Sequence, residues 1–447
     1  MSENKSETGK NFLVQGSILA IAGVITKIIG AVYRIPLVNI LGDKGMGYYG
    51  VAFQIYAIAL TLTSYSLPLA VSKLVSARLA TGQYKNAYRV FRGAMTFAIA
   101  AGGIVGAIIF FGADFIASNL MAMKMSALAL QVLAPCILIV AILGVFRGFF
   151  QGNGSMVPTA VSQIIEQIVN AVVSVVGAYM LLKVGKEVAA RKNNDSYGAA
   201  YAASGGTLGT VMGALAALLF LFFLFLAFRR QMERDRGNKT ESYKRVFKVL
   251  LLTIAPVILS ATVYNLCGVV DNAMFGTIMS IQGHKESEYA ALLGIVTGKY
   301  DTLMNVPLAI SSAFGSSLIP SIVLTAKTGN RRQVHEKIDI FTRFNMIIAI
   351  PCAAGFIVLA KPLLDLLFFT ENNTLGGVLL QMGAISVVFY NLSTVTNAVL
   401  QGLDNMMVPV KSAAISLVIH LISLFLRRVG VKWGIYAVGL SKIVFSL

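Results

Sequence analysis

The fold is decided by residues 16–41, GSILAIAGVITKIIGAVYRIPLVNIL, an apolar stretch long enough to cross a bilayer that also contains Lys27 and Arg34. A spanning helix needs about 20 apolar residues, and a Lys or Arg near its centre costs about 2.5–3.5 kcal/mol on insertion scales. The two cations are about two helical turns apart, so they share one face and lie about 10 Å apart along the axis. We expect this face to line a water-filled cavity and to hold an anionic group.

A second interpretation is that each cation extends to the nearest headgroup layer. Arg34 is suited to this because it lies close to Pro36 and to the predicted helix end. Lys27 is not, because it lies well inside the predicted span. The sequence therefore favours an internal role for Lys27 and leaves both interpretations open for Arg34.

The composition excludes a soluble globular protein. Of the 447 residues, 57% are hydrophobic and 13% are charged, and the mean hydropathy is +0.76. These values predict an all-α polytopic membrane protein. The net charge of +18 comes from 37 basic and 19 acidic residues. The basic residues lie in short segments between apolar stretches, as membrane topology produces, so we expect no nucleic-acid partner.

Apolar runs bounded by Gly, Pro and charged residues predict twelve helices in two sets of six. The first set covers residues 12–35, 47–72, 88–111, 126–150, 157–182 and 199–228, and the second covers 247–279, 288–324, 340–369, 375–401, 408–428 and 433 onward. A charged segment separates them, which predicts an N-terminal lobe (1–228), a basic linker (229–246) and a C-terminal lobe (247–447). About twice as many Lys and Arg residues lie on the side of the N-terminus and linker as on the other, which predicts that this side is cytoplasmic.

The two halves repeat short motifs in the same order. PLAVS at 68–72 recurs as PLAIS at 307–311, TGQ at 81–83 as TGN at 328–330, QG at 151–152 as QG at 401–402, and MVP at 156–158 as MVP at 407–409. Because each half has an even number of predicted helices, both halves enter the membrane from the same side. The repeat predicts two parallel six-helix bundles related by a pseudo-two-fold axis along the membrane normal, with a site between them near the midplane.

Polar residues on the fifth predicted helix repeat on one face: Gln163, Glu166, Gln167 and Asn170. Such a face can hold helices together, or it can contribute to a substrate site. An ionisable residue inside a span needs a partner or water, and Lys27 is a candidate partner for Glu166. We therefore add Gln163, Glu166 and Asn170 to Lys27 and Arg34 as candidate substrate-binding residues.

The seventh and eighth predicted helices carry further polar residues. Asn265, Asp271 and Asn272 lie on the seventh, and Lys299 and Asp301 lie on the eighth. Lys299 and Asp301 can satisfy each other or their neighbours. Asp271 is the better candidate for a sodium or proton site.

Enzyme chemistry is not indicated. GIVTGK at 294–299 is one residue short of a phosphate-binding loop and lies in an apolar span, and the histidines and cysteines have no metal-ligand spacing. We expect no enzyme activity, no metal and no cofactor. Any energy for transport has to come from an ion gradient or the membrane potential.

The sequence resembles a known family in three stretches. They are VITKIIGAVYRIPLVNILGDKGMGYYGVAFQIY at 24–56, SLPLAVSKLVSARLATGQ at 66–83 and FRGFFQGNGSMVPTAVSQIIEQ at 146–167. These stretches are similar to the polysaccharide-exporter branch of the multidrug/oligosaccharidyl-lipid/polysaccharide (MOP) flippase superfamily, particularly to the group of stage V sporulation protein B and the lipid II flippases of Gram-positive bacteria. The resemblance begins near residue 11 and covers nearly the whole chain.

The resemblance implies two lobes around a central cavity that opens alternately to either side of the membrane. It implies that the basic residues of the first helix, here Lys27 and Arg34, bind the pyrophosphate of a lipid carrier. Some members couple transport to sodium through an acidic residue on the seventh helix, which Asp271 matches. The family has a thirteenth and a fourteenth helix, whereas this sequence stops within its twelfth, so we expect the sequence to be truncated.

Three functions follow from the sequence. The first is a flippase for an undecaprenyl-pyrophosphate-linked saccharide, with lipid-linked oligosaccharide and membrane lipids as partners and a monomer as the default state. The second is a drug or cation antiporter of the same superfamily, which would need an acidic, aromatic cavity. The third is a non-transporting scaffold for envelope synthesis that recruits enzymes through its basic linker.

Overall fold

The protein is all-helical in the computed structural model, which describes residues 2–232, 240–327 and 331–403 together with positions 405, 407–408, 411–412, 415–416 and 418–419. This confirms the predicted fold class. The main helices are α1 (Ser2–Thr63), α2 (Leu67–Leu79), α3 (Tyr84–Phe115), α4 (Ala127–Gly152), α5 (Val157–Lys192), α6 (Ser196–Met232), α7 (Tyr243–Ile281), α8 (Glu286–Gly294), α9 (Asp301–Lys327), α10 (Arg331–Leu367), α11 (Thr374–Gly383) and α12 (Ser386–Gly402). Short η segments follow α3 (η1, Ile116–Leu120), precede α4 (η2, Lys124–Ser126) and join α8 to α9 (η3, Ile295–Tyr300).

Helix α1 contains the first predicted span (12–35) and most of the second (47–72), joined by a sharp turn at Gly42. Gly42 has φ 63° and ψ 179°, a non-helical conformation inside an otherwise continuous helix. Glycine adopts positive φ readily because it has no Cβ. The turn reverses the chain, so a first arm (residues 2–41) and a second arm (residues 43–63) lie side by side. The first arm carries Lys27 and Arg34.

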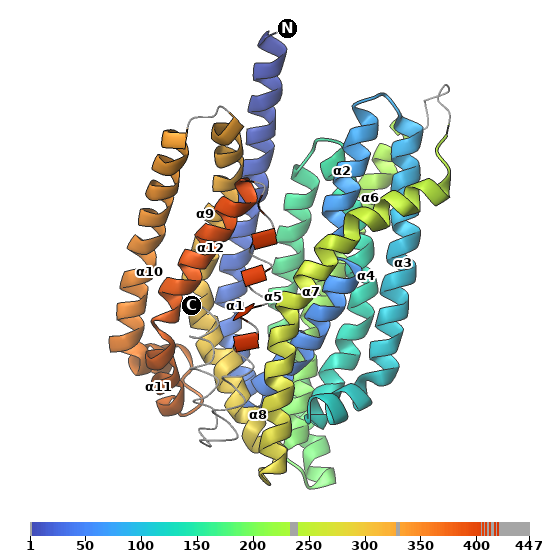
Figure 1. The fold of residues 1–447 in the computed structure, drawn as a ribbon. Coiled ribbons are helices and arrows are strands. Elements are labelled where there is room, and N and C mark those ends of the chain that lie inside the picture. Colours follow the sequence, from blue (N-terminus) through green and yellow to red (C-terminus); the bar gives the residue numbers. More distant parts are fainter. Residues whose placement is uncertain are drawn as a thin grey trace.

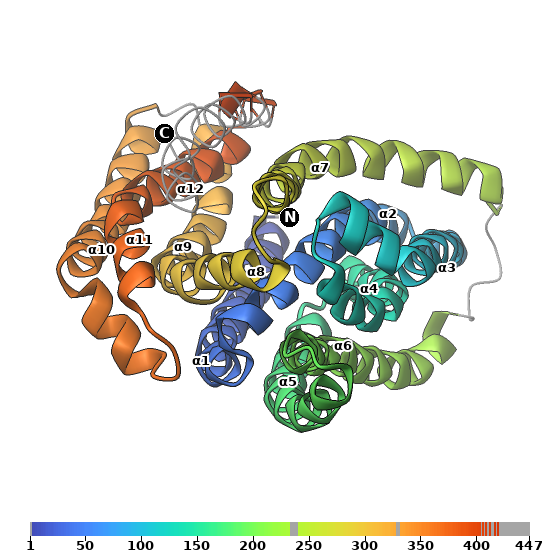
Figure 2. The same cartoon turned by 90° about the horizontal axis from the view of Figure 1, so that it is seen from below.

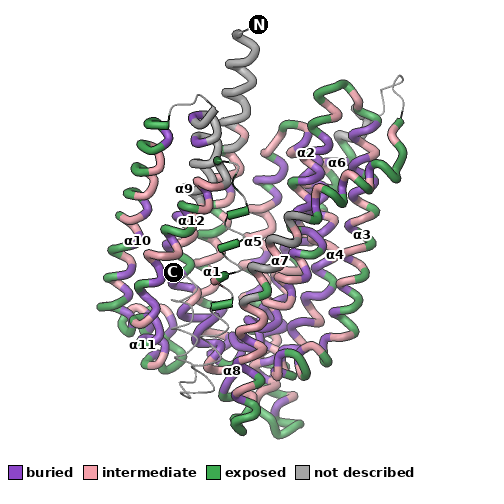
Figure 3. Tube along the Cα trace, in the orientation of Figure 1, coloured by how far each residue is buried: buried purple, intermediate pink, exposed green. Residues whose placement is uncertain are grey.

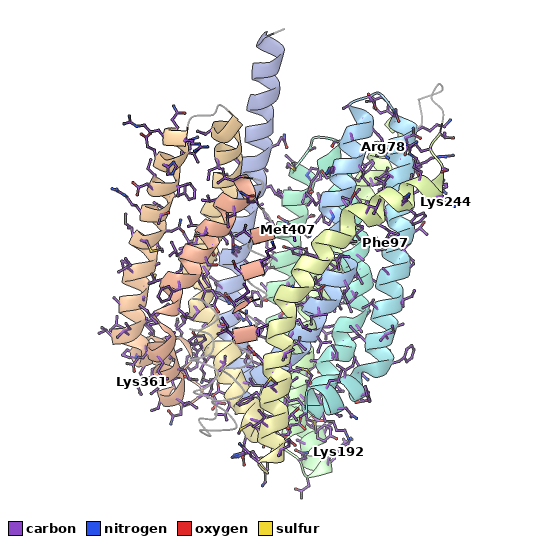
Figure 4. All side chains as sticks on the ribbon, in the orientation of Figure 1. Arg78, Phe97, Lys192, Lys244, Lys361 and Met407 are labelled. Carbon is purple, nitrogen blue, oxygen red and sulfur yellow. The ribbon has the colours of Figure 1, made fainter. Side chains whose placement is uncertain are left out.

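The connections gather at two ends of the molecule (Figure 1). The upper end in that view holds the start of α1, the α2–α3 and α4–α5 connections, the end of α6 with the start of α7, and the end of α9 with the start of α10. The lower end holds the Gly42 turn and the α3–α4, α5–α6, α7–α8 and α10–α11 connections. Figure 4 shows Arg78 and Lys244 at the upper end and Lys192 and Lys361 at the lower end.

Viewed from below, the helices form two groups (Figure 2). Helices α2–α6 lie on one side and α8–α12 on the other, with α1 and α7 between them. Helix α7 contacts α1, α2, α3 and α8. The last two predicted helices, at 408–428 and from 433 onward, lie largely outside the described residues, so the division into six and six stays a prediction.

The outer surface is suited to lipid. Exposed apolar side chains include Phe111 on α3 (86% exposed), Ile347 on α10 (70%) and Leu366 on α10 (75%). Within the described residues, six helices are long and apolar enough to cross a membrane, or seven if the bent pair α11–α12 counts as one span. The protein is therefore a multi-pass membrane protein.

The interior contains two apolar clusters. One lies among α2, α3, α4, α6 and the start of α7, and it includes a group of aromatic rings in mutual contact, mostly edge to face: Phe91, Phe146, Phe149 and Phe225. The other extends from α1 through α4 to α8, η3 and α11. Figure 3 shows buried residues concentrated around α8, where this second cluster joins the two helix groups. The two groups are therefore most firmly connected near the lower end.

Candidate functional site

Lys27 lies where the first arm of α1 meets the α8–α12 group. Its Nζ donates a hydrogen bond to Ser312 Oγ on α9, and Ser312 Oγ donates to Ala309 O at 3.0 Å. The Lys27 side chain is otherwise exposed. Its ammonium has three N–H donors, so one hydrogen bond to a neutral hydroxyl leaves its charge uncompensated within this contact.

Arg34 lies about two turns further along the same arm and is half-buried. Its Nε is buried and has no hydrogen-bond partner among the described residues. Most buried polar atoms in proteins are hydrogen-bonded, and a guanidinium nitrogen without an acceptor is costly. Arg34 is therefore a cation with unused donor capacity, which an anionic ligand could satisfy.

The polar face of α5 packs partly against α1. Asn170 Nδ2 donates to Tyr33 Oη at 3.3 Å, and Asn170 Oδ1 accepts from Ser174 Oγ at 2.9 Å. Gln167 lies so close to the first arm that a Cβ on Gly30 would be 3.2 Å from its Nε2. Asn170 and Gln167 therefore hold α5 against the arm that carries both cations. Gln163 is half-buried on the same helix.

Glu166 is not paired with Lys27 as expected but with Arg147 of α4. The Glu166 Oε2 to Arg147 Nη2 distance is 2.6 Å, and Arg147 Nε donates to Ser162 Oγ at 3.1 Å. Arg147 was not among the residues selected from the sequence, although it lies within both the predicted fourth helix (126–150) and α4, which ends at Gly152. Its position three residues inside the predicted end at residue 150 was the available signal. The Glu166 charge is thus balanced within its own helix group.

Asp271 lies in the part of α7 that contacts the second arm of α1. On that helix, Asn265 Nδ2 donates to Thr61 Oγ1 at 3.0 Å and Asn272 Nδ2 donates to Gln54 Oε1 at 2.7 Å. Asp271 is half-buried beside Asn272. Within the described residues, no group of three or more His, Cys, Asp or Glu side chains could hold a metal ion.

The lower end closes around a buried ion pair. Lys299 of η3 is 1% exposed, and its Nζ lies 2.7 Å from Oδ1 of Asp43, which follows the Gly42 turn. Of the alternatives that the sequence left open for Lys299, the structure pairs it with a neighbouring helix, through Asp43 of α1. The backbones around the pair nearly touch, because a Cβ on Gly294 would lie 1.7 Å from Asp43 O and one on Gly47 would lie 2.0 Å from Ala290 O. We call this contact the lower seam.

Comparisons with known proteins agree with this architecture. A model of the family described as "Polysaccharide biosynthesis protein" matches residues 12–326. The lipid II flippase MurJ of Bacillus subtilis (strain 168) is 27% identical over 424 residues, which covers 92% of this chain and 76% of that protein. Stage V sporulation protein B of the same organism is 26% identical over 313 residues, covering 70% of this chain and 58% of that protein.

Solved structures share the fold at low sequence identity. An inward-facing multidrug resistance MATE family transporter of the MOP superfamily has a TM-score of 0.71 at 14% identity, covering 94% of this chain and 91% of that one. An outward-facing structure of such a transporter has a TM-score of 0.65 at 15% identity, covering 97% and 92%. These similarities establish a MATE-like helical fold.

Proposed function

The chain belongs to the polysaccharide biosynthesis protein family, and from this premise we propose that it is a flippase for an undecaprenyl-pyrophosphate-linked saccharide, such as lipid II or another polysaccharide precursor. The main support is the pair Lys27 and Arg34 on the first arm of α1. Lys27 is exposed with a neutral partner, and Arg34 has a buried Nε without one. A pyrophosphate would supply acceptors to both, and charge attraction is strong where water is scarce.

The pairing of Glu166 with Arg147 favours an anionic cargo. A cationic drug would need an uncompensated carboxylate, and this one lies 2.6 Å from a guanidinium. With Glu166 neutralised, Lys27 and Arg34 stay without an ion-pair partner among the described residues. In the proposal, Gln163 and Asn170 contact the sugar or support the first arm, and the prenyl tail stays in lipid.

The direction of movement follows from the basic residues and the lower seam. We place the upper end in the cytoplasm, because it carries the N-terminus and the more basic connections, and the protein in the bacterial cytoplasmic membrane. The structure is then closed at the outer end and represents the state that loads cargo from the cytoplasm. Opening the lower seam while the upper halves approach each other would release the saccharide outside.

We further propose that Asp271 couples this cycle to sodium or protons. Its position among Asn265 and Asn272, which bind the second arm of α1, would link ion binding to helix packing. Asp271→Asn should then abolish any dependence of transport on the ion gradient while leaving cargo binding intact.

The decisive experiment is growth rescue in a strain depleted of its own lipid II flippase. We expect the wild-type protein to restore growth, and Lys27→Ala and Arg34→Ala each to fail at matched membrane abundance. Lys183→Ala is the matched control. Lys183 also lies on a membrane helix, but its Nζ lies over the ring of Tyr179 on the same helix, 4.6 Å from the ring centroid, so this variant should rescue fully.

The alternatives give different results. A scaffold would tolerate both alanine variants, because they remove charge from the proposed binding site and leave the fold unchanged. A cation antiporter would fail to rescue even as wild type and would instead confer drug resistance. Wild-type rescue with loss in both variants would identify lipid II as a cargo.

A further inference from the structure

Glu286, at the lower end, joins the two helix groups because its side-chain carboxylate binds the backbone of the other group. Glu286 is the first residue of α8, and its Oε1 accepts a hydrogen bond from the backbone N–H of Met125, 2.9 Å away in the α3–α4 connection. One turn later on α8, the Tyr289 hydroxyl donates to Ala122 O. The first turn of α8 is thus hydrogen-bonded to residues 122–125 of the other group.

The gripped connection has an unusual backbone. Ala122 has φ 51°, a left-handed conformation that residues with a Cβ rarely adopt. Residues in such conformations persist when surrounding contacts hold them. Met121 adds to these contacts, because a Cβ on Gly276 of α7 would lie 2.4 Å from its carbonyl oxygen. The connection is therefore shaped by its docking against the α7–α8 corner, which Figure 1 shows at the lower end.

Glu286 is also the titratable group at this contact. Burial raises the pKa of its carboxyl above the usual glutamate value, because loss of water outweighs the hydrogen bonds from Met125 and Lys124 and the charge of Lys124. The charge of Glu286 also acts on two tyrosines, Tyr48 from the second arm of α1 and Tyr289 from α8. Next to Glu286 in the sequence, His284 Nδ1 lies 3.1 Å from Glu288 Oε2, and both side chains are about half exposed.

We propose that Glu286 is a proton-sensitive latch that holds the lower end closed. Undocking returns the carboxyl to water, where its pKa falls towards the ordinary value of about 4.3. The docked state therefore binds a proton more readily than the undocked state. Acidification through the interval between the two pKa values favours docking, and a rise in pH weakens it.

This inference rests on the proposed alternating access, because it assumes that the lower end opens during the cycle. With the lower end outside the cell, a proton taken from the outer solution onto Glu286 would favour return to the state that loads cargo. A neutral carboxyl keeps one carbonyl oxygen to accept the Met125 N–H, so the protonated latch still docks.

The test measures opening directly, by electron spin resonance distances between labels on Asn119→Cys and Lys285→Cys, on a background with the native cysteines replaced. Both positions are exposed and flank the latch. In proteoliposomes we expect the ratio of short to long distances to rise as the pH falls from 8 to 5, by up to about tenfold per pH unit for one proton.

Variants separate Glu286 from its neighbours. Glu286→Gln, which mimics the protonated carboxyl, should keep the short distance at every pH. Glu286→Ala, which has no acceptor, should favour the long distance at every pH. His284→Gln with Glu288→Gln is the matched control, and it should keep the wild-type pH dependence.

Two results with the variants would overturn the latch: pH dependence that survives in Glu286→Gln, or pH dependence that disappears in the His284 and Glu288 control. A wild-type distance distribution that does not change with pH would overturn it as well. Because no cargo is present, these results are independent of whether Lys27 and Arg34 bind a pyrophosphate.

Discussion

Helix α1 meets the α8–α12 group in opposite ways at the lower seam and at Lys27. At the seam, the contact combines a buried ion pair, Asp43 with Lys299, and backbones so close that Gly47 and Gly294 have no room for a Cβ. At Lys27, an exposed side chain reaches a serine across the interface. The first contact is buried and closely packed, whereas the second is a single hydrogen bond of an exposed side chain. This difference suits a molecule that is closed at one end and loads cargo through the other.

Removing the charge of Lys299 should have the largest effect on stability. Lys299→Met leaves the Asp43 carboxylate buried without its partner, and breaking a buried pair this way costs about 3–5 kcal/mol. We expect a large fall in the thermal unfolding midpoint of the purified protein. The double variant Asp43→Asn with Lys299→Met should recover much of the loss, and a double variant as unstable as the single one would show that the pair is not the cause.

Adding one methyl group to the seam should have the next largest effect. Gly294→Ala places a Cβ within 1.7 Å of Asp43 O, so a backbone must move, at a cost of about 1–3 kcal/mol. Gly30→Ala is the matched control, because its Cβ would meet only the mobile end of Gln167 at 3.2 Å. The unfolding midpoint of Gly294→Ala should be lower than that of Gly30→Ala. Equal midpoints would mean that the lower seam adapts to an added methyl group as easily as the contact between Gly30 and Gln167.

Lys27→Ala should have the smallest effect on stability. An exposed side chain with one hydrogen bond contributes within about 0.5 kcal/mol, so the unfolding midpoint should stay close to that of the wild type. The same variant is expected to fail in growth rescue. A destabilisation comparable to that of Gly294→Ala would indicate that Lys27 is a structural residue and would contradict its proposed role in binding.

Part of this architecture could be predicted from the sequence. Helices were visible because apolar runs bounded by charges repeat along the chain, and Lys27 was recognisable because a cation inside a span is unusual. The partners of charged residues were not visible. Asp43 and Lys299 are 256 positions apart, and no local pattern connects them. Arg147 and Glu166 are only 19 apart, but pairing them needs the relative rotation of α4 and α5, which periodicity does not supply.

The Arg147–Glu166 pair has an electrical consequence. Because the pair carries no net charge, the proposed binding site would have a charge of plus two from Lys27 and Arg34, and a pyrophosphate diester with two negative charges would neutralise it. Moving one elementary charge across the membrane involves about 2.3 kcal/mol of electrical work per 100 mV, but moving a neutral complex involves none. Voltage would then act on the empty carrier, so the step that it controls is the return and not the delivery.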